Sequence, residues 1–290
     1  MLTIFATPKA FEGLFGVIQK NAIFSWTKLD PRPEIILFGR EPGTAELCQR
    51  LGLKHVPEVA TSNFGTPLIS DMFSRAQSIA SQALVCFVNA DIILTTESMI
   101  AARNVSQWSP KFLMVGQRSD LDVRELVDFE SSDWERDIKL ATQRRGRRRS
   151  EINIDWFVFP TGQLTAIPPF AIGRLWYDNW LLWDASNRGI PLIDATAFVP
   201  LIHQRHDYSH GGGVSAIWSG PESRANQALL GHWSHWHAVA HAKWMLTSSG
   251  SVVPARGLKY RLARPRRWAS HMLRFTRPLR RRLQRQLSTT

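Results

Sequence analysis

Short apolar runs alternate with helical patterns along the first 118 residues, and this alternation constrains the fold more than any other feature. Residues 2–6, 34–38 and 84–88 are apolar runs of the kind typical of strands buried on both faces, and 55–59 is expected as a further, shorter strand. The helical patterns between them lie at residues 11–18, 44–51 and 68–82. We therefore expect an α/β fold whose largely parallel sheet is covered by helices on both faces.

Later segments extend this pattern. Further strands are expected at residues 112–117, 154–159 and within 191–199, and further helices at 176–183 and 222–230. We expect residues 1–250 to form one domain and residues 251–290 to form a separate basic tail.

Asn89, Ala90 and Asp91 directly follow the apolar run 84–88. Asn89 and Asp91 are two residues apart, so they point to the same side of an extended chain. A carboxylate at the end of a buried strand costs desolvation free energy unless a cation compensates it. Mg²⁺ or Mn²⁺ holding a diphosphate would meet that need. The alternative is a turn in which these side chains cap the next helix.

Three polar or turn segments fall at the ends of expected parallel strands. They are Thr7-Pro8, Gly39 and the segment 89–91. Ligands of such sheets bind beyond the carboxyl ends of the strands, so these segments predict a shared binding site. The chain lacks both the glycine-rich dinucleotide fingerprint and the P-loop motif, which argues against both of those nucleotide-binding classes.

A second group of potential metal ligands lies at residues 203–210. It contains His203, His206, Asp207 and His210, followed by three glycines. A zinc site made by histidines alone is one interpretation, and a single histidine that completes a metal site formed elsewhere is the one we favour. The histidines of the aromatic stretch 232–241 are expected to be surface or core residues.

Residues 119–150 are polar and end in an arginine-rich run. We expect either a mobile loop over the site or a solvated insertion.

The expected helix 176–183 carries tryptophans at positions 176, 180 and 183. Their spacing favours core packing of the set, with sugar stacking as the alternative. Asp178 falls in the first turn of this helix, where the helix dipole favours a carboxylate.

The order of these parts resembles the nucleotide-sugar-dependent glycosyltransferases of the GT-A fold, over about residues 2–230. The motifs that carry the resemblance are Phe64-Gly65-Thr66-Pro67-Leu68 with Asp71-Met72-Phe73, Phe87-Val88-Asn89-Ala90-Asp91-Ile92, Gly173-Arg174 with Trp176 and Asp178-Asn179-Trp180, and His203-Gln204-Arg205-His206-Asp207-Tyr208. The family's usual motif is Asp-x-Asp. Asn89 stands at its first position here, which leaves Asp91 as the main metal ligand.

The resemblance implies a Rossmann-like, mixed and mostly parallel sheet flanked by helices, with a nucleotide-sugar-binding half at 1–118 and an acceptor half at 151–250. It implies a Mn²⁺ or Mg²⁺ ion at Asp91, His203 and His206. It implies an inverting transfer with Asp178 as the base. The nucleotide-sugar-binding residues would be Thr7, Pro8, Gly39, Asp71, Asn89, Ala90 and Asp91. Arg174 would pair with a phosphate or an acidic sugar, and Trp176 or Trp180 would contact the acceptor.

The activity that the resemblance implies is metal-assisted transfer of a hexosyl or N-acetylhexosaminyl group, as in polysaccharide biosynthesis. The donor would be a nucleotide-diphosphate sugar, and the acceptor a hydroxyl of a glycan or a lipid-linked sugar. The alternatives are a nucleotidyltransferase and a nucleic-acid-binding protein that uses the arginine-rich segments. We do not expect a nucleic acid partner, because the first 250 residues are electrically neutral and show no recognition motif.

The formal net charge of +12 originates in the C-terminal segment. Residues 251–290 hold twelve of the 36 Lys and Arg residues and none of the 24 acidic ones. Within 256–285, arginines alternate with leucine and aromatic residues, as in segments that bind anionic membranes. Pro265 and Pro278 prevent one long helix, and a solvated disordered tail is the alternative.

The two cysteines, Cys48 and Cys86, are expected to be reduced core residues, which suits a reducing compartment. The sequence lacks both a long apolar run and a signal-peptide pattern at its N-terminus. We therefore expect a cytoplasmic protein, with a peripheral position on the inner membrane face if the basic tail binds lipid.

Overall fold

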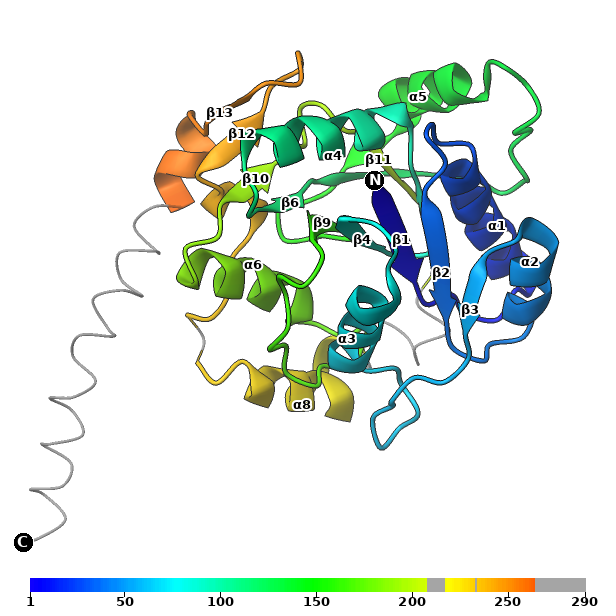
Figure 1. Ribbon diagram of the computed structural model, residues 1–290, viewed down its shortest axis with the longest axis horizontal. Coiled ribbons are helices and arrows are strands. Elements are labelled where there is room, and N and C mark those ends of the chain that lie inside the picture. The colour runs from blue at the N-terminus through cyan, green and yellow to red at the C-terminus, as the bar shows by residue number, and fades with distance from the viewer. Residues whose placement is uncertain (208–216, 233, 264–290) are drawn as a thin grey trace, which may run out of the picture.

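The computed structural model describes residues 1–207, 217–232 and 234–263. Its main sheet has nine strands in the order β13-β12-β10-β6-β9-β4-β1-β2-β3 (Figure 1). The strands are β1 (Leu2–Ala6), β2 (Glu34–Phe38), β3 (Lys54–Val56), β4 (Leu84–Val88), β6 (Leu113–Val115), β9 (Trp156–Pro160), β10 (Leu192–Asp194), β12 (Trp244–Leu246) and β13 (Val252–Pro254). Strand β9 is antiparallel to β4 and β6, and β13 is antiparallel to β12, whereas the other pairs are parallel. The expected mixed, mostly parallel sheet is confirmed.

Helices cover both faces of this sheet, because consecutive strand residues point to opposite faces. Ile4 and Cys86 face one hydrophobic cluster, while their neighbours Phe5 and Phe87 face the other. The first face packs against α1 (Gly13–Thr27), α2 (Thr44–Leu51) and α4 (Thr96–Trp108). The second face packs against α3 (Ile69–Ile79) and α6 (Tyr177–Asn187), with α8 (Pro221–Leu229) beyond α3 (Figure 1).

A smaller sheet stands beside the main one. Its strands are β5 (Ile92–Ile93), β11 (Leu201–Gln204), β7 (Arg118–Leu121) and β8 (Arg147–Arg148), in that order. Helix α5 (Trp134–Arg145) packs on it through Ile138, the helix's one buried residue. The expectation of a mobile loop at 119–150 is therefore wrong, since this segment holds most of β7, all of α5 and β8, and the alternative of a solvated insertion agrees better with a helix that has one buried residue. Helix α5 is so polar that its apolar periodicity is too weak to show in the sequence.

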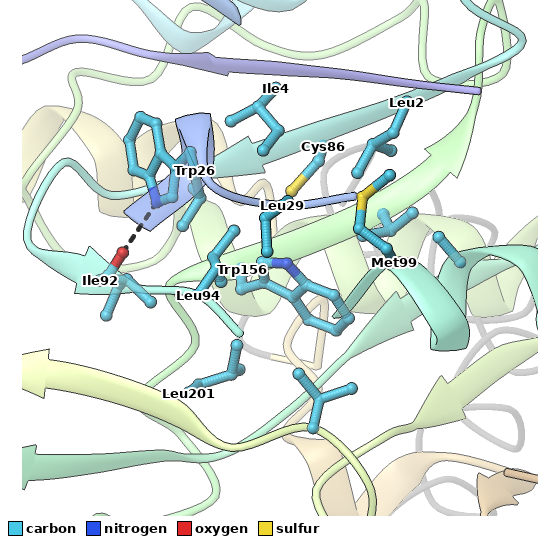
Figure 2. Close-up of a cluster of buried hydrophobic side chains, with 14 of the residues drawn as sticks. Leu2, Ile4, Trp26, Leu29, Cys86, Ile92, Leu94, Met99, Trp156 and Leu201 are labelled. Carbon is cyan, nitrogen blue, oxygen red and sulfur yellow. Dashed lines mark hydrogen bonds between the residues drawn. The ribbon is translucent and has the colours of Figure 1, made fainter. Parts of the chain in front are cut away.

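The core on the first face fixes the start of the small sheet. Trp26 of α1 is fully buried, and its indole N–H donates a hydrogen bond to the carbonyl of Ile92 at 2.9 Å (Figure 2). Trp156 of β9 is buried in the same cluster. Since Ile92 directly follows Asp91, this packing holds the Asp91 backbone in place.

The chain continues past residue 250 as part of the folded body. The expected boundary there falls inside the antiparallel pair β12–β13. Lys259 and Tyr260 both donate hydrogen bonds to the buried carboxylate of Asp194 at 2.7 Å. Most of the segment 256–285, as well as Tyr208 and His210, lies outside the described residues, so membrane binding stays a prediction. Among the residues that are described, no helix is both long and apolar enough to cross a membrane.

Replacing the buried indole tests this account of the core. Trp26→Phe removes the donor to the Ile92 carbonyl and leaves a cavity, so the free energy of unfolding should fall by about 2–4 kcal/mol. Trp218→Phe, at a side chain that is 54% exposed, should change it by less than about 0.5 kcal/mol. Urea denaturation followed by circular dichroism measures both, and equal effects of the two substitutions would contradict the account.

Candidate active site

A cleft of about 770 Å³ lies across the carboxyl ends of β1 to β4. Its volume is in the range of pockets that hold a whole small ligand. Of the predicted binding residues, its lining includes Thr7, Pro8, Gly39, Asn89, Ala90, Asp91 and Arg174. The structure thus brings together the three strand-end segments that the sequence suggested, although the first and the last are more than 80 residues apart in the chain.

Gly39 shapes the floor of the cleft. Its φ of 98° is a conformation that favours glycine, and an added Cβ would lie 3.3 Å from the Thr7 hydroxyl. The Thr7 hydroxyl donates a hydrogen bond to the carbonyl of Phe38 at 3.1 Å. Gly39 therefore permits the ends of β1 and β2 to lie close together where they line the cleft.

Asp91, His203 and His206 converge beside the cleft, and of the three only Asp91 lines it. Asp91 Oδ2 lies 3.5 Å from His203 Nε2 and 3.0 Å from His206 Nε2. Strand pairing produces this convergence, because β11 runs antiparallel to β5 with His203 opposite Ile92. One ligand atom from each of the three residues lies within 4.8 Å of the other two. The predicted association of Asp91 with the two histidines is thus present in the structure.

The surroundings of the two histidines suit metal ligands. While each Nε2 faces Asp91, His203 Nδ1 lies 3.0 Å from Asp120 Oδ1, and His206 Nδ1 lies 2.6 Å from the carbonyl of Asp207. Metal-binding histidines characteristically hold a carboxylate or a carbonyl with their second nitrogen. In addition, Asp91 Oδ1 is buried without a hydrogen-bond partner. A cation would satisfy that oxygen, so the residues present fit a divalent metal.

The electrostatics keep Asp91 ionised. Burial would raise the pKa of its carboxyl group, but the nearby His203 and His206 hold the pKa well below its usual range. Burial likewise opposes a charge on His203, yet Asp91 and Asp120 raise its pKa to about 9 against the effect of Arg118. Asp91 is therefore available as an anionic ligand at neutral pH.

Asn89 belongs to a second layer of polar groups behind Asp91. Its amide donates a hydrogen bond to Asp155 Oδ1 at 2.6 Å, and Arg118 Nη1 binds the other oxygen of the same carboxylate at 2.5 Å. An aspartate at position 89 would place a second carboxylate beside Asp155, and the two negative charges would repel each other. The asparagine amide instead donates a hydrogen bond to Asp155. This contact gives a physical reason for the departure from Asp-x-Asp.

Asp178 is in the first turn of α6, as predicted, but it does not line the cleft. The backbone N–H of Asn179 donates to Asp178 Oδ1 at 2.9 Å. Burial, with a further contribution from Asp155, raises the pKa of Asp178 to about 7. A carboxyl group with such a pKa can accept a proton near neutral pH.

The two tryptophans beside Asp178 have different surroundings. Trp180 is buried and packs against the rings of Phe170 and Trp183, as expected for core packing. Trp176 is only partly buried and precedes α6 with a φ of 93°, the one positive φ at a non-glycine residue in the described part of the chain. A strained backbone at such a position is often associated with function.

Arg174 and Asp71 both have protein partners. Arg174 lines the cleft but forms a salt bridge with Glu222, at 2.7 Å from Nη2 to Oε2. Glu222 also accepts hydrogen bonds from Ser62 and Thr66, so it ties the loop 61–67 to Arg174. Asp71 pairs with Arg75 and accepts the N–H of Ala60, and it does not line the cleft.

The sequence did not indicate four charged residues of this region: Lys9, Arg118, Asp120 and Asp155. Lys9 lines the cleft, and burial lowers its pKa to about 8 although Asp91 opposes the shift. Its position just after Thr7-Pro8 could have drawn attention to it. Arg118 and Asp120 alternate along a polar strand, and nothing in the sequence connects them to Asp91.

A scan against protein-family models found no match, and a search of the curated proteins found none either. Among solved structures, the chain is similar to Mycobacterium tuberculosis glucosyl-3-phosphoglycerate synthase, with 16% identity, coverage of 79% of both chains and a TM-score of 0.47. A complex of that synthase with Mn²⁺, uridine diphosphate and glucosyl-3-phosphoglycerate matches with 14% identity, coverage of 79% and 78%, and a TM-score of 0.46. Staphylococcus aureus TarS residues 1–349 match with 14% identity and a TM-score of 0.34 over 44% of this chain, which spans only 38% of that one.

Metal binding by the Asp91–His203–His206 triad can be measured directly. The free Mn²⁺ signal in electron paramagnetic resonance should fall on addition of the protein and should not fall with Asp91→Ala, since the anionic ligand is then lost. Asp120→Asn should weaken binding by about 10- to 100-fold, because Asp120 orients His203. His232→Gln, outside the triad, is the control. Undiminished Mn²⁺ binding by Asp91→Ala would show that the metal site is elsewhere.

Proposed function

We propose that this protein is a glycosyltransferase that moves a sugar from a nucleotide-diphosphate sugar to a hydroxyl group of a glycan or lipid-linked acceptor. The observation that carries the proposal is the Asp91–His203–His206 triad, which meets the cleft through Asp91 and includes a buried, unpartnered carboxylate oxygen. A diphosphate bound through a divalent metal requires a cleft that can admit the ligand and a carboxylate that can bind the metal.

The residues of the cleft suggest an orientation for the donor. The nucleoside would lie over Thr7, Pro8 and Gly39, and the diphosphate would lie by Asp91 and Lys9. Two imidazoles and one carboxylate suit Mn²⁺ better than Mg²⁺, which prefers oxygen ligands. When bound, the metal would neutralise the charge of the departing diphosphate. The Lys9 ammonium group would add positive charge on the same side.

Asp178 is the proposed base. A raised pKa suits proton transfer from an acceptor hydroxyl, which requires hydrogen-bond reach between the two oxygens. Attack from the side opposite the diphosphate would invert the configuration of the sugar. Trp176, partly buried just before α6, would contact the acceptor, with Trp180 supporting it from the core.

Product identity tests the proposed function against a nucleotidyltransferase. Incubation with a suitable nucleotide-diphosphate sugar and Mn²⁺ should slowly release nucleoside diphosphate, because water can replace the acceptor. The products can be separated by ion-exchange chromatography. A parallel incubation supplies a nucleoside triphosphate and a sugar 1-phosphate. Release of pyrophosphate there, with no nucleoside diphosphate released from the nucleotide-diphosphate sugar, would instead identify nucleotidyl transfer and contradict the proposal.

Asp178→Asn tests the base. It should retain donor binding and lower the transfer rate by about 10²- to 10⁴-fold, because the amide cannot accept the proton. In the wild type, the rate should increase with pH through about 7 and then level off, since the base must be ionised. Asp184→Asn, on the same helix but paired with Arg188, is the matched control and should change the rate little. A near-normal rate for Asp178→Asn would point to another base or to retention of configuration.

A further inference from the structure

A second, smaller pocket of about 170 Å³ lies on the small sheet. Its lining includes four guanidinium groups. The lining residues are Asp120, Leu121, Asp122, Arg145, Arg147, Arg149 and Arg205. The proposed function gives this pocket no role, although Asp120 also belongs to the surroundings of the metal triad.

Strand register places this arginine pocket on the same face of the sheet as His203. Asp120 of β7 lies opposite His203 of β11 on one side and opposite Arg147 of β8 on the other. Residues directly opposite each other share a face, as do residues two apart in a strand. Arg149 and Arg205 follow Arg147 and His203 by two residues. The pocket is therefore one to two strand spacings, about 5–10 Å, from His203.

The positive charge of the pocket is largely uncompensated. Among the described residues, Arg145, Arg147 and Arg205 have no ion-pair partner. Arg149 Nε is buried without a hydrogen bond and lies 3.4 Å from Asp120 Oδ2.

The two acids of the pocket offset only part of its charge, since Asp120 faces Arg149 alone among the pocket arginines and both acids also have partners outside the pocket. Asp120 is shared with Arg118 and His203, and Asp122 pairs with Arg124 at 2.6 Å. Several guanidinium groups that converge on one concavity are suited to bind phosphate or carboxylate.

We infer that the arginine pocket binds an anionic group, a phosphate or a carboxylate, carried by the acceptor. At about 170 Å³ it is smaller than the roughly 300–1,000 Å³ of whole-ligand pockets, so it suits one charged group of a larger molecule. Although Arg145, Arg147 and Arg205 are exposed, their convergence on one small pocket differs from the extended stripe of basic residues that follows a nucleic acid backbone.

This inference rests on the proposed function, which assigns the donor to the large cleft. Metal-bound phosphate oxygens lie about 2 Å from the ion, so the donor diphosphate remains at the triad. The anion in the arginine pocket is then a different group. The distance between the arginine pocket and the triad would place the acceptor across the same face of the small sheet. An acceptor without a negative charge would bind weakly.

Calorimetric titration of the full chain with a hexose 6-phosphate tests the inference. EDTA is present so that no metal-bound phosphate contributes, and inorganic phosphate and the uncharged hexose are titrated in parallel. Arg147→Gln and Arg205→Gln should each weaken binding of the hexose 6-phosphate by about tenfold or more, because each removes a charged hydrogen-bond donor. Arg148→Gln is the matched control, since Arg148 lies on the same strand but outside the pocket lining.

Three results would overturn the inference. The first is no binding of either phosphate. The second is equal weakening by Arg148→Gln, or displacement by single-stranded RNA, because both indicate diffuse surface charge. The third is tighter binding of inorganic phosphate than of the hexose 6-phosphate, which would exclude an acceptor group. Binding of uridine diphosphate with Mn²⁺ to the wild type, measured separately, tests the donor cleft, so failure of one site is distinguishable from failure of the other.

Discussion

The burial of one carboxylate between two imidazoles is the interaction on which the rest of the site depends. Asp91 follows a strand buried on both faces, and its charge would be costly there without nearby cations. The chain brings two imidazoles to it from 112 and 115 residues away by pairing β11 with β5, and these imidazoles could share a metal ion with the carboxylate. The hydrogen bond from Trp26 to Ile92 holds the backbone on which this pairing depends. The core and the site are therefore stabilised by the same contacts.

Charged side chains surround the triad, and their contacts determine what each neighbouring residue can bind. Asp120 orients His203 and forms one wall of the arginine pocket. Asp155 binds Arg118 and accepts from Asn89, so a carboxamide fits at a position where a carboxylate would be repelled. The raised pKa of Asp178 depends in part on the same Asp155. Because these groups share partners, substitutions among them should not have additive effects.

Much of the fold could be predicted because local sequence patterns determine many of its strands and helices. Strands 2–6, 34–38 and 84–88 and helix 44–51 match their predicted bounds, since each is set by an apolar run or by a stop such as Gly52. The small sheet could not be predicted, because Arg118–Leu121 and Arg147–Arg148 are polar strands defined by their partners. The resemblance to GT-A enzymes linked the two histidines to Asp91. Asp120 was missed because only the register of β7 against β11 brings it to His203.

We propose that the triad holds a metal and that donor binding in the cleft needs this metal. Thermal unfolding in the presence of UDP-, GDP-, dTDP- and CMP-sugars, each with Mn²⁺ and with EDTA, tests it most directly, because a ligand specific for the native state raises the melting temperature. The account predicts that one nucleotide class raises the melting temperature of the wild type and that EDTA abolishes the increase. An increase of the same size in EDTA, or no increase with any donor, would contradict it.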